Sequence, residues 1–224
     1  MTRPRIHVVL DPAAVVGGLL AEAAARGETI VLTGGSTPGK AYERAAALEP
    51  NWSNVSLWWG DERCVPPDDD RSNYGLAKRT LLDRLAGEPD VHRIRGELQP
   101  ADAAGEYEKA IEGATLDLLL LGLGPDGHVA SLFPGSQQLF ERDRLVTSGE
   151  AGLEPFVDRV TLTLPALLSA KRVVFLVAGG DKADAVARAF TGEITDDVPA
   201  GLLRTGDAPI DVYVDEAAGA TLPT

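Results

Sequence analysis

The chain has 224 residues, 44% of them hydrophobic and 25% charged, and 34 acidic against 21 basic residues give a formal net charge of −13. This length suits one domain, residues 1–224, with a core large enough to need no disulfide, and the single Cys64 could form none within the chain. The acidic balance argues against nucleic acid, no apolar run is long enough to cross a bilayer, and the N-terminus is a poor signal peptide, so we expect a cytoplasmic protein.

Apolar runs typical of strands alternate with helical patterns along the chain. The predicted strands span 6–10, 29–33, 55–59, 116–123, 159–164, 172–179 and 210–215, and the predicted helices 12–26, 38–48, 72–85, 101–112 and about 181–190. Several strand runs are continuously apolar, as parallel strands covered on both faces are. The sequence therefore predicts an α/β fold: a doubly wound, mainly parallel sheet with helices on both faces, in a Rossmann-like three-layer arrangement. Ligands of such sheets bind at the carboxyl ends of the strands.

The loop TGGSTPGK, residues 33–40, follows one predicted strand. Its glycines allow a ligand close to the backbone, Ser36 or Thr37 can cap the following helix, and the free N–H groups at a helix start attract anions. We therefore predict that Gly35, Ser36 and Thr37 bind an anion; the alternative is an ordinary capped turn. The loop also resembles a nucleotide P-loop, but Ala41 stands where that motif needs a magnesium-binding hydroxyl.

The loop GDERCVPPDDDRSNYG, residues 60–75, follows another predicted strand. Arg63 lies where a side chain at a strand end would face the ligand crevice, although a charged loop is more often simply solvated. The run Asp68–Asp70 lacks the spacing of a calcium loop and has no histidine nearby, so we predict no metal site there. Cys64 is expected to be inert, because no histidine is close in sequence.

The segment GLGPDGHVASLFPG, residues 122–135, matches G-x-G-x-x-G over its first six positions. Pro125 and Pro134 leave little room for a long phosphate-binding helix, and no acid suited to binding ribose follows at the expected distance. These departures argue against a dinucleotide turn. We therefore predict no cofactor.

The alternative interpretation of this loop centres on Asp126 and His128. If the backbone is extended there, the two side chains point the same way across Gly127. A carboxylate beside an imidazole orients the ring and stabilises its protonated form, which is the arrangement of a general base. The competing interpretation is a histidine that caps a helix or is satisfied by the backbone. The position at a strand end, between glycines, favours catalysis.

The fourth loop, AGGDKADAV, spans residues 178–186. Asp181 is predicted to cap a helix, which places Lys182 in the first turn. A cation there opposes the helix dipole, so local stability does not account for it. Asp184 could offset the charge, but a bound phosphate explains the lysine better.

Taken together, the motifs resemble those of the 6-phosphogluconolactonase family, within the larger glucosamine-6-phosphate isomerase/lactonase group. They occur in order along nearly the whole chain: TGGSTP, WWGDERCVPPDDDRSNYG, LGLGPDGHVASLFPG, RVTLTLPAL, VFLVAGGDKADAV and VPAGLLR. The resemblance implies metal-free hydrolysis of 6-phospho-D-glucono-1,5-lactone in the oxidative pentose phosphate pathway. It assigns catalysis to His128 and Asp126, and phosphate binding to the turn Gly35-Ser36-Thr37, Arg63 and Lys182. Family members often have threonine where this chain has Val129.

Two alternatives remain open at this stage. Glucosamine-6-phosphate deaminases share the glycine-loop histidine but typically have a glutamate five residues later, where this chain has Phe133. A non-catalytic regulator that binds sugar phosphates would explain the anion loops but not the Asp126–His128 pair. The expected partner is a small phosphosugar lactone, with neither nucleic acid nor membrane. The sequence does not determine the oligomeric state, and a monomer is compatible with it.

Overall fold

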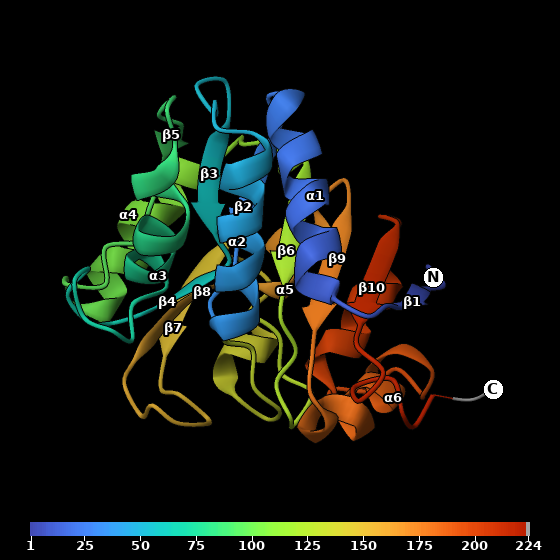
Figure 1. Cartoon of the computed structure of the whole chain (residues 1–224). Helices are drawn as coiled ribbons and strands as arrows, with labels where there is room; N and C mark the ends of the chain where they lie inside the picture. The colour runs from blue at the N-terminus through green and yellow to red at the C-terminus, as the bar shows by residue number, and fades with distance from the viewer. Residues whose placement is uncertain (223–224) are drawn as a thin grey trace.

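A parallel sheet of seven strands forms the centre of the computed structural model, which describes residues 1–222. The strands run in the order β1-β10-β9-β6-β2-β3-β5 (Figure 1). In that order they span Arg5–Val8, Ile210–Val214, Val173–Val177, Leu118–Leu121, Thr29–Leu32, Ser56–Trp59 and Asp90–Val91. All the neighbouring pairs are parallel. The prediction of a mainly parallel sheet is confirmed.

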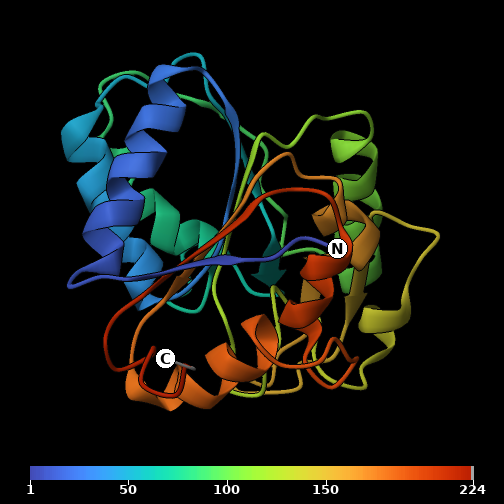
Figure 2. The ribbon, with the colours of Figure 1, turned by 90° about the vertical axis from the view of Figure 1, so that its right-hand side faces the viewer.

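Helices cover both faces of this sheet, as Figure 2 shows. On one face lie α1 (Pro12–Ala25), α2 (Ser36–Leu48) and α3 (Asn73–Thr80). On the other lie α4 (Pro100–Ile111) and α5 (Leu164–Leu168), and α6 (Ala183–Phe190) follows β9. Short 3-10 helices span Leu82–Arg84 (η1), Gln137–Phe140 (η2), Gly180–Lys182 (η3) and Pro199–Thr205 (η4). Within residues 1–222, no helix has the length and apolar character needed to span a bilayer.

A second, antiparallel sheet was not predicted. Its three strands are β4 (Asp61–Arg63), β8 (Arg159–Leu162) and β7 (Val146–Gly149), in that order. The sequence Asp-Glu-Arg of β4 is fully charged, so no apolar period marks it as a strand, and its backbone is held by pairing with β8. The sequence predicted no strand between residues 59 and 72, so the prediction was wrong at Asp61–Arg63, the strand that includes Arg63.

The strand order changes direction between β2 and β6, which pair in parallel at the middle of the sheet. From β2 the chain continues outward through β3 to β5. From β6 it continues through β9 and β10 toward the opposite edge, where β1 lies. The chain segments that follow the carboxyl ends of β2 and β6 therefore lead toward opposite edges of the sheet. Such a switch point leaves a crevice between them, which is where α/β sheets bind ligands.

Two buried tyrosines clamp the backbone at the ends of β2 and β3. The Tyr42 hydroxyl accepts from the Thr33 N–H at 3.0 Å and donates to the Thr33 carbonyl at 2.6 Å. The Tyr107 hydroxyl does the same at Trp59, with distances of 2.8 and 3.0 Å. Burial raises the pKa of both phenols, so each stays a neutral hydroxyl able to donate and accept. The two loops that follow therefore start from fixed points.

Glu62 fixes the start of α3 relative to β4. Its side chain is buried and accepts four hydrogen bonds, two on each oxygen. The donors are the N–H groups of Arg63, Asn73 and Tyr74 and the hydroxyl of Ser72, at 2.7–2.9 Å. Two of these N–H groups belong to the first turn of α3 and have no partner within the helix. The carboxylate thus ties this helix to the strand that carries Arg63.

We expect Glu62→Gln to lower the free energy of unfolding by about 2 kcal/mol, the scale for leaving a buried donor unsatisfied. The amide NH₂ of glutamine would face a backbone N–H that now donates to a carboxylate oxygen. Chemical denaturation measures the loss. Glu43→Gln is the matched control, because Glu43 is exposed and its partner among the described residues is Arg84, in an ion pair. Equal stability of the two variants would contradict the assignment.

Candidate functional site

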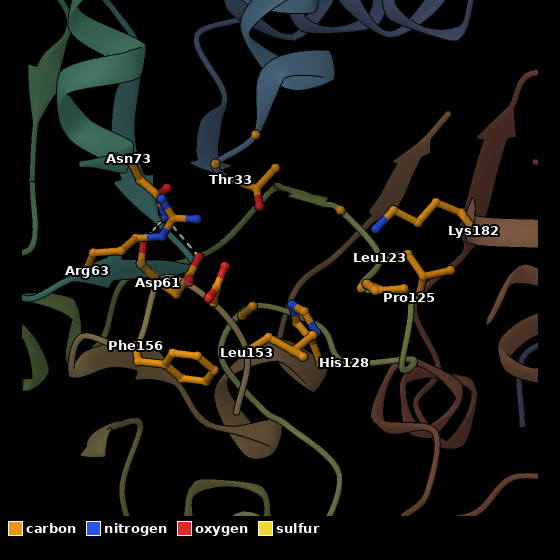
Figure 3. Close-up of a pocket in the computed structure, with 16 residues that line it drawn as sticks. Thr33, Asp61, Arg63, Asn73, Leu123, Pro125, His128, Leu153, Phe156 and Lys182 are labelled. Carbon is orange, nitrogen blue, oxygen red and sulfur yellow. Dashed lines mark hydrogen bonds between the residues drawn. The ribbon is translucent and has the colours of Figure 1, made fainter. Parts of the chain in front are cut away.

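A cavity of about 640 Å³ lies at the switch point, at the carboxyl ends of β2 and β6 (Figure 3). Five parts of the chain line it: the loop after β2, β4 with the start of α3, the loop after β6, the segment between β7 and β8, and η3. The lining residues are Thr33, Gly34, Gly35, Asp61, Arg63, Asn73, Gly122, Leu123, Gly124, Pro125, His128, Ala130, Leu153, Glu154, Phe156 and Lys182.

The side chains of His128 and Asp126 are hydrogen-bonded to each other in the loop after β6. The imidazole Nδ1 lies 2.6 Å from Asp126 Oδ1, and the same oxygen accepts the His128 N–H at 3.1 Å. The backbone between them is a turn and not the extended segment predicted: Gly127 has φ 92°, and its N–H donates to the Gly124 carbonyl at 3.0 Å. The predicted pair of Asp126 and His128 is therefore present, but a turn, and not an extended backbone, brings the two side chains together.

Gly124 supplies the space that this pair occupies. A Cβ atom at Gly124 would lie 1.9 Å from His128 Nδ1 and 2.6 Å from Asp126 Oδ1, closer than atoms can approach. The Gly124 N–H also donates to the His128 carbonyl at 2.9 Å, which closes the loop. The second glycine of G-x-G-x-x-G is therefore required by the imidazole and the carboxylate.

The electrostatics of the pair keep Asp126 ionised. Burial alone would raise the pKa of Asp126, but the hydrogen bond and charge of His128 outweigh it and hold that pKa below its usual value. An ionised Asp126 requires the proton on Nδ1, which leaves the Nε2 lone pair of a neutral His128 free. Among residues 1–222, no side chain or backbone group bonds to Nε2. The ring lines the cavity, so this lone pair is available to a bound molecule.

An aromatic ring packs against the histidine. The centroid of Phe133 lies 4.5 Å from that of His128, and Phe133 is buried. The phenyl ring limits the orientations open to the imidazole and offers no group that could exchange a proton. Any proton transfer at His128 must therefore involve the cavity or Asp126.

Arg63 enters the cavity from β4, as predicted for a side chain at a strand end. One guanidinium nitrogen donates to the Arg71 carbonyl, while Nε is buried and has no partner within the described part of the chain. A buried guanidinium N–H without an acceptor is costly and is expected where a ligand supplies one.

Asp61, beside Arg63, is a site residue that the sequence did not reveal. Its carboxylate is buried and accepts from the Ser131 hydroxyl at 2.7 Å and from Asn73 Nδ2 at 3.2 Å. Asn73 Nδ2 also donates to the Asp61 carbonyl at 2.9 Å. These partners lie 12 and 70 positions away along the chain, so no local motif could have identified them.

Gly35 lies at the start of α2, but the predicted caps are wrong. Gly35 itself is the N-cap residue, and Ser36 and Thr37 belong to the first helical turn. Within residues 1–222, no side chain caps this helix. Gly35 lines the cavity, whereas Ser36 and Thr37 do not. What they offer a ligand in this arrangement is their backbone N–H groups, which the missing cap leaves free.

Lys182 extends into the cavity from η3, on the side opposite Arg63 in Figure 3. Asp181 does not cap a helix, because the residues that precede α6 form a 3-10 turn, and its carboxylate lies 3.4 Å from Lys182 Nζ. Asp184 pairs with Arg188 at 2.8 Å instead of offsetting the lysine. Lys182 remains only 23% exposed, which keeps its ammonium at the cavity.

The remaining candidates in the acidic loop have local explanations. Asp69 forms an ion pair with Arg71 at 2.7 Å. Burial raises the pKa of the Cys64 thiol to about 11, so little thiolate forms near neutral pH. Within residues 1–222, no three His, Cys, Asp or Glu side chains come together in a way that could hold a metal ion.

Comparison with known proteins identifies related sequences and folds. The family model described as "Glucosamine-6-phosphate isomerases/6-phosphogluconolactonase" matches residues 13–211. A 6-phosphogluconolactonase of Mycobacterium tuberculosis is 42% identical over 204 residues, covering 83% of this chain and 82% of its own. The structure of 6-phosphogluconolactonase from Trypanosoma brucei superposes with a TM-score of 0.87 at 27% identity, over 100% of both chains. A monomeric glucosamine-6-phosphate deaminase has a TM-score of 0.86 at 19% identity, covering 98% of this chain and 99% of its own, a likeness of fold alone.

We expect Gly124→Ala to displace the His128 ring, because the added methyl group would overlap Nδ1. In ¹H–¹⁵N spectra of the imidazoles, the His128 signals should shift while those of His7 and His92 stay. Gly122→Ala is the control, since a Cβ there meets nothing within 4 Å. Unchanged His128 signals in Gly124→Ala would show that the backbone of the loop moves to accommodate the methyl group while the imidazole stays in place.

Proposed function

The chain belongs to the glucosamine-6-phosphate isomerase/6-phosphogluconolactonase family, and from this premise we propose that it hydrolyses 6-phospho-D-glucono-1,5-lactone to 6-phospho-D-gluconate. This is the lactone-opening step of the oxidative pentose phosphate pathway. The observation that carries the proposal is the Asp126–His128 pair, with a free Nε2 in a cavity that also holds Arg63 and Lys182. A general base beside anion-binding groups suits the hydrolysis of a phosphorylated ester.

His128 acts on water in the proposed reaction. Neutral Nε2 accepts a proton from water as the oxygen attacks the lactone carbonyl carbon, and Asp126 stabilises the imidazolium that forms. When the tetrahedral intermediate collapses, the bond from C1 to the ring oxygen breaks. The imidazolium returns its proton to that oxygen, so the histidine ends neutral. Water and lactone have then become an acid and an alcohol within one molecule.

The substrate phosphate binds between Lys182 and the start of α2. Lys182 supplies a charge, and the uncapped first turn supplies N–H groups of Ser36 and Thr37 beside Gly35. A net charge of −13 repels anions at long range, so these local groups have to provide the attraction. Arg63 faces Lys182 across the cavity. It serves either the phosphate or the carbonyl oxygen that becomes negative during attack.

Deamination of glucosamine 6-phosphate is the alternative that shares the fold. The buried Phe133 ring argues against it, because a carboxylate beside the histidine is expected for opening the sugar ring. Ammonia release from glucosamine 6-phosphate is the direct assay, and we expect none. A regulator without catalysis would bind the lactone and leave its lifetime unchanged.

We expect His128→Ala to reduce kcat by about 10²–10⁴, the scale of general-base catalysis, with KM little changed. The lactone is generated in situ from glucose 6-phosphate, and acid release is followed against the spontaneous background. His92→Ala is the control, since that histidine stacks on Trp58 outside the cavity. Near-normal turnover of His128→Ala would remove this residue from the chemistry.

Lys182→Ala and Arg63→Ala separate the two roles proposed for the cations. Loss of a phosphate contact equal in ground and transition states raises KM alone, which we expect for Lys182→Ala, by about tenfold or more. If Arg63 stabilises the carbonyl oxygen, Arg63→Ala lowers kcat; if it binds phosphate, KM rises. Steady-state kinetics on the lactone gives both constants. Unchanged constants for Lys182→Ala would exclude that lysine from the phosphate site.

A further inference from the structure

Arg159, the first residue of β8, is a buried arginine that forms no ion pair with any carboxylate among residues 1–222. Its side chain donates instead to two backbone carbonyls, from Nη1 to Val157 at 2.8 Å and from Nη2 to Pro155 at 2.9 Å. Only 3% of the residue is exposed. Buried cations are usually paired with an acid, so this one requires another explanation.

A second cation increases the cost of this burial. Arg63 of β4 lies directly opposite Arg159 in the antiparallel ladder. Burial lowers the pKa of Arg159, and the charge of Arg63 lowers it further; the nearby carboxylates of Asp61 and Glu62 offset this only in part. An apolar side chain at this position would avoid both penalties. The arginine is therefore explained by the two carbonyls that it holds.

Those carbonyls belong to the segment Leu153–Val157, here called the strap, which connects β7 to β8. The strap has no regular secondary structure, yet Leu153, Glu154 and Phe156 line the cavity. Phe156 is 71% exposed, and Figure 3 shows its ring at the cavity on the side of Arg63, with Leu153 nearer His128. Within residues 1–222, no other side chain donates a hydrogen bond to the strap.

We propose that Arg159 is a positioning residue for the hydrolysis, which anchors the strap so that Leu153 and Phe156 form an apolar wall against the carbon face of the bound sugar ring. This inference rests on the proposed function. The forked guanidinium can hold two carbonyls at once, which the single ammonium of lysine cannot do in the same geometry. An anionic substrate at Arg63 also offsets the repulsion between the two arginines, so binding of substrate and seating of the strap favour each other.

The first test compares Arg159→Lys with Arg204→Lys on the lactone. Arg204 is the control, because it is another arginine that holds two backbone carbonyls, those of Ala189 and Gly192, both through Nη1, and neither of these residues lines the cavity. We expect Arg159→Lys to raise KM about tenfold, the scale of a hydrogen bond to a charged group, with kcat changed less than threefold. Arg204→Lys should leave both constants unchanged. An unchanged KM for Arg159→Lys, or an equal rise in the control, would overturn the proposal.

A second measurement needs no turnover, so it separates failure of this inference from failure of the proposed function. Chymotrypsin should cleave after Phe156 more readily once the strap is released. Cleavage after Phe140, also exposed at 51%, serves as the internal reference. We expect Arg159→Lys to raise the ratio of Phe156 to Phe140 cleavage about tenfold, and Arg204→Lys to leave it unchanged. An unchanged ratio in Arg159→Lys would show that this residue does not hold the strap.

The double variant distinguishes action through the strap from general destabilisation. Phe156→Ala alone should raise KM about threefold to tenfold through loss of apolar contact. In an Arg159→Lys background the same substitution should add little, because the wall is already displaced. Full additivity would overturn the proposal. If Arg159→Lys does not fold, Phe156→Ala alone tests the proposal, because Phe156 is exposed and its removal leaves the core intact. An unchanged KM for Phe156→Ala would then show that Phe156 forms no apolar wall against the substrate.

Discussion

The parallel pairing of β2 with β6 is the constraint on which the site depends. Because the chain leaves these two neighbours toward opposite edges, no connection can cross the gap at their carboxyl ends. The uncapped start of α2 and the histidine loop therefore face one another across that gap. Neither loop could form a cavity alone. The position of the chemistry follows from strand order before any catalytic side chain is considered.

Buried polar side chains turn this gap into a defined site. Tyr42 and Tyr107 hold the backbone at the ends of β2 and β3, and Glu62 binds α3 to β4. The polar atoms of each of these side chains all have hydrogen-bond partners. A buried polar side chain that is fully hydrogen-bonded fixes the segments it joins instead of destabilising the fold. Arg159 extends the same principle to a segment without secondary structure. The segment that begins at Trp59 can therefore present Arg63 with little freedom, and the hydrogen bond from the Gly124 N–H to the His128 carbonyl restricts the loop that carries His128, as preorganised catalysis requires.

The sequence predicted those features of the fold and the site that depend on residues close together along the chain. Apolar runs identified six of the strands in the central sheet, and the prediction that Asp126 and His128 lie close together needed only three consecutive positions. β4 and the carboxylate of Asp61 depend on partners far along the chain, in β8 and at Ser131, so no window of sequence contains them. The extent of the domain, the cytoplasmic location and the absence of a cofactor remain predictions.

The glycine pattern shows why a matching motif does not identify a site by itself. In a dinucleotide turn, glycine leaves space for a pyrophosphate beside the backbone. At Gly124 the same absence of a Cβ leaves space for an imidazole and a carboxylate of the chain itself. Both demands select glycine at the same spacing, so the glycines cannot distinguish them. The distinction lies in what fills the space, and here Asp126 and His128 occupy it and exclude a phosphate. A motif defined by missing side chains has to be interpreted through the side chains around it.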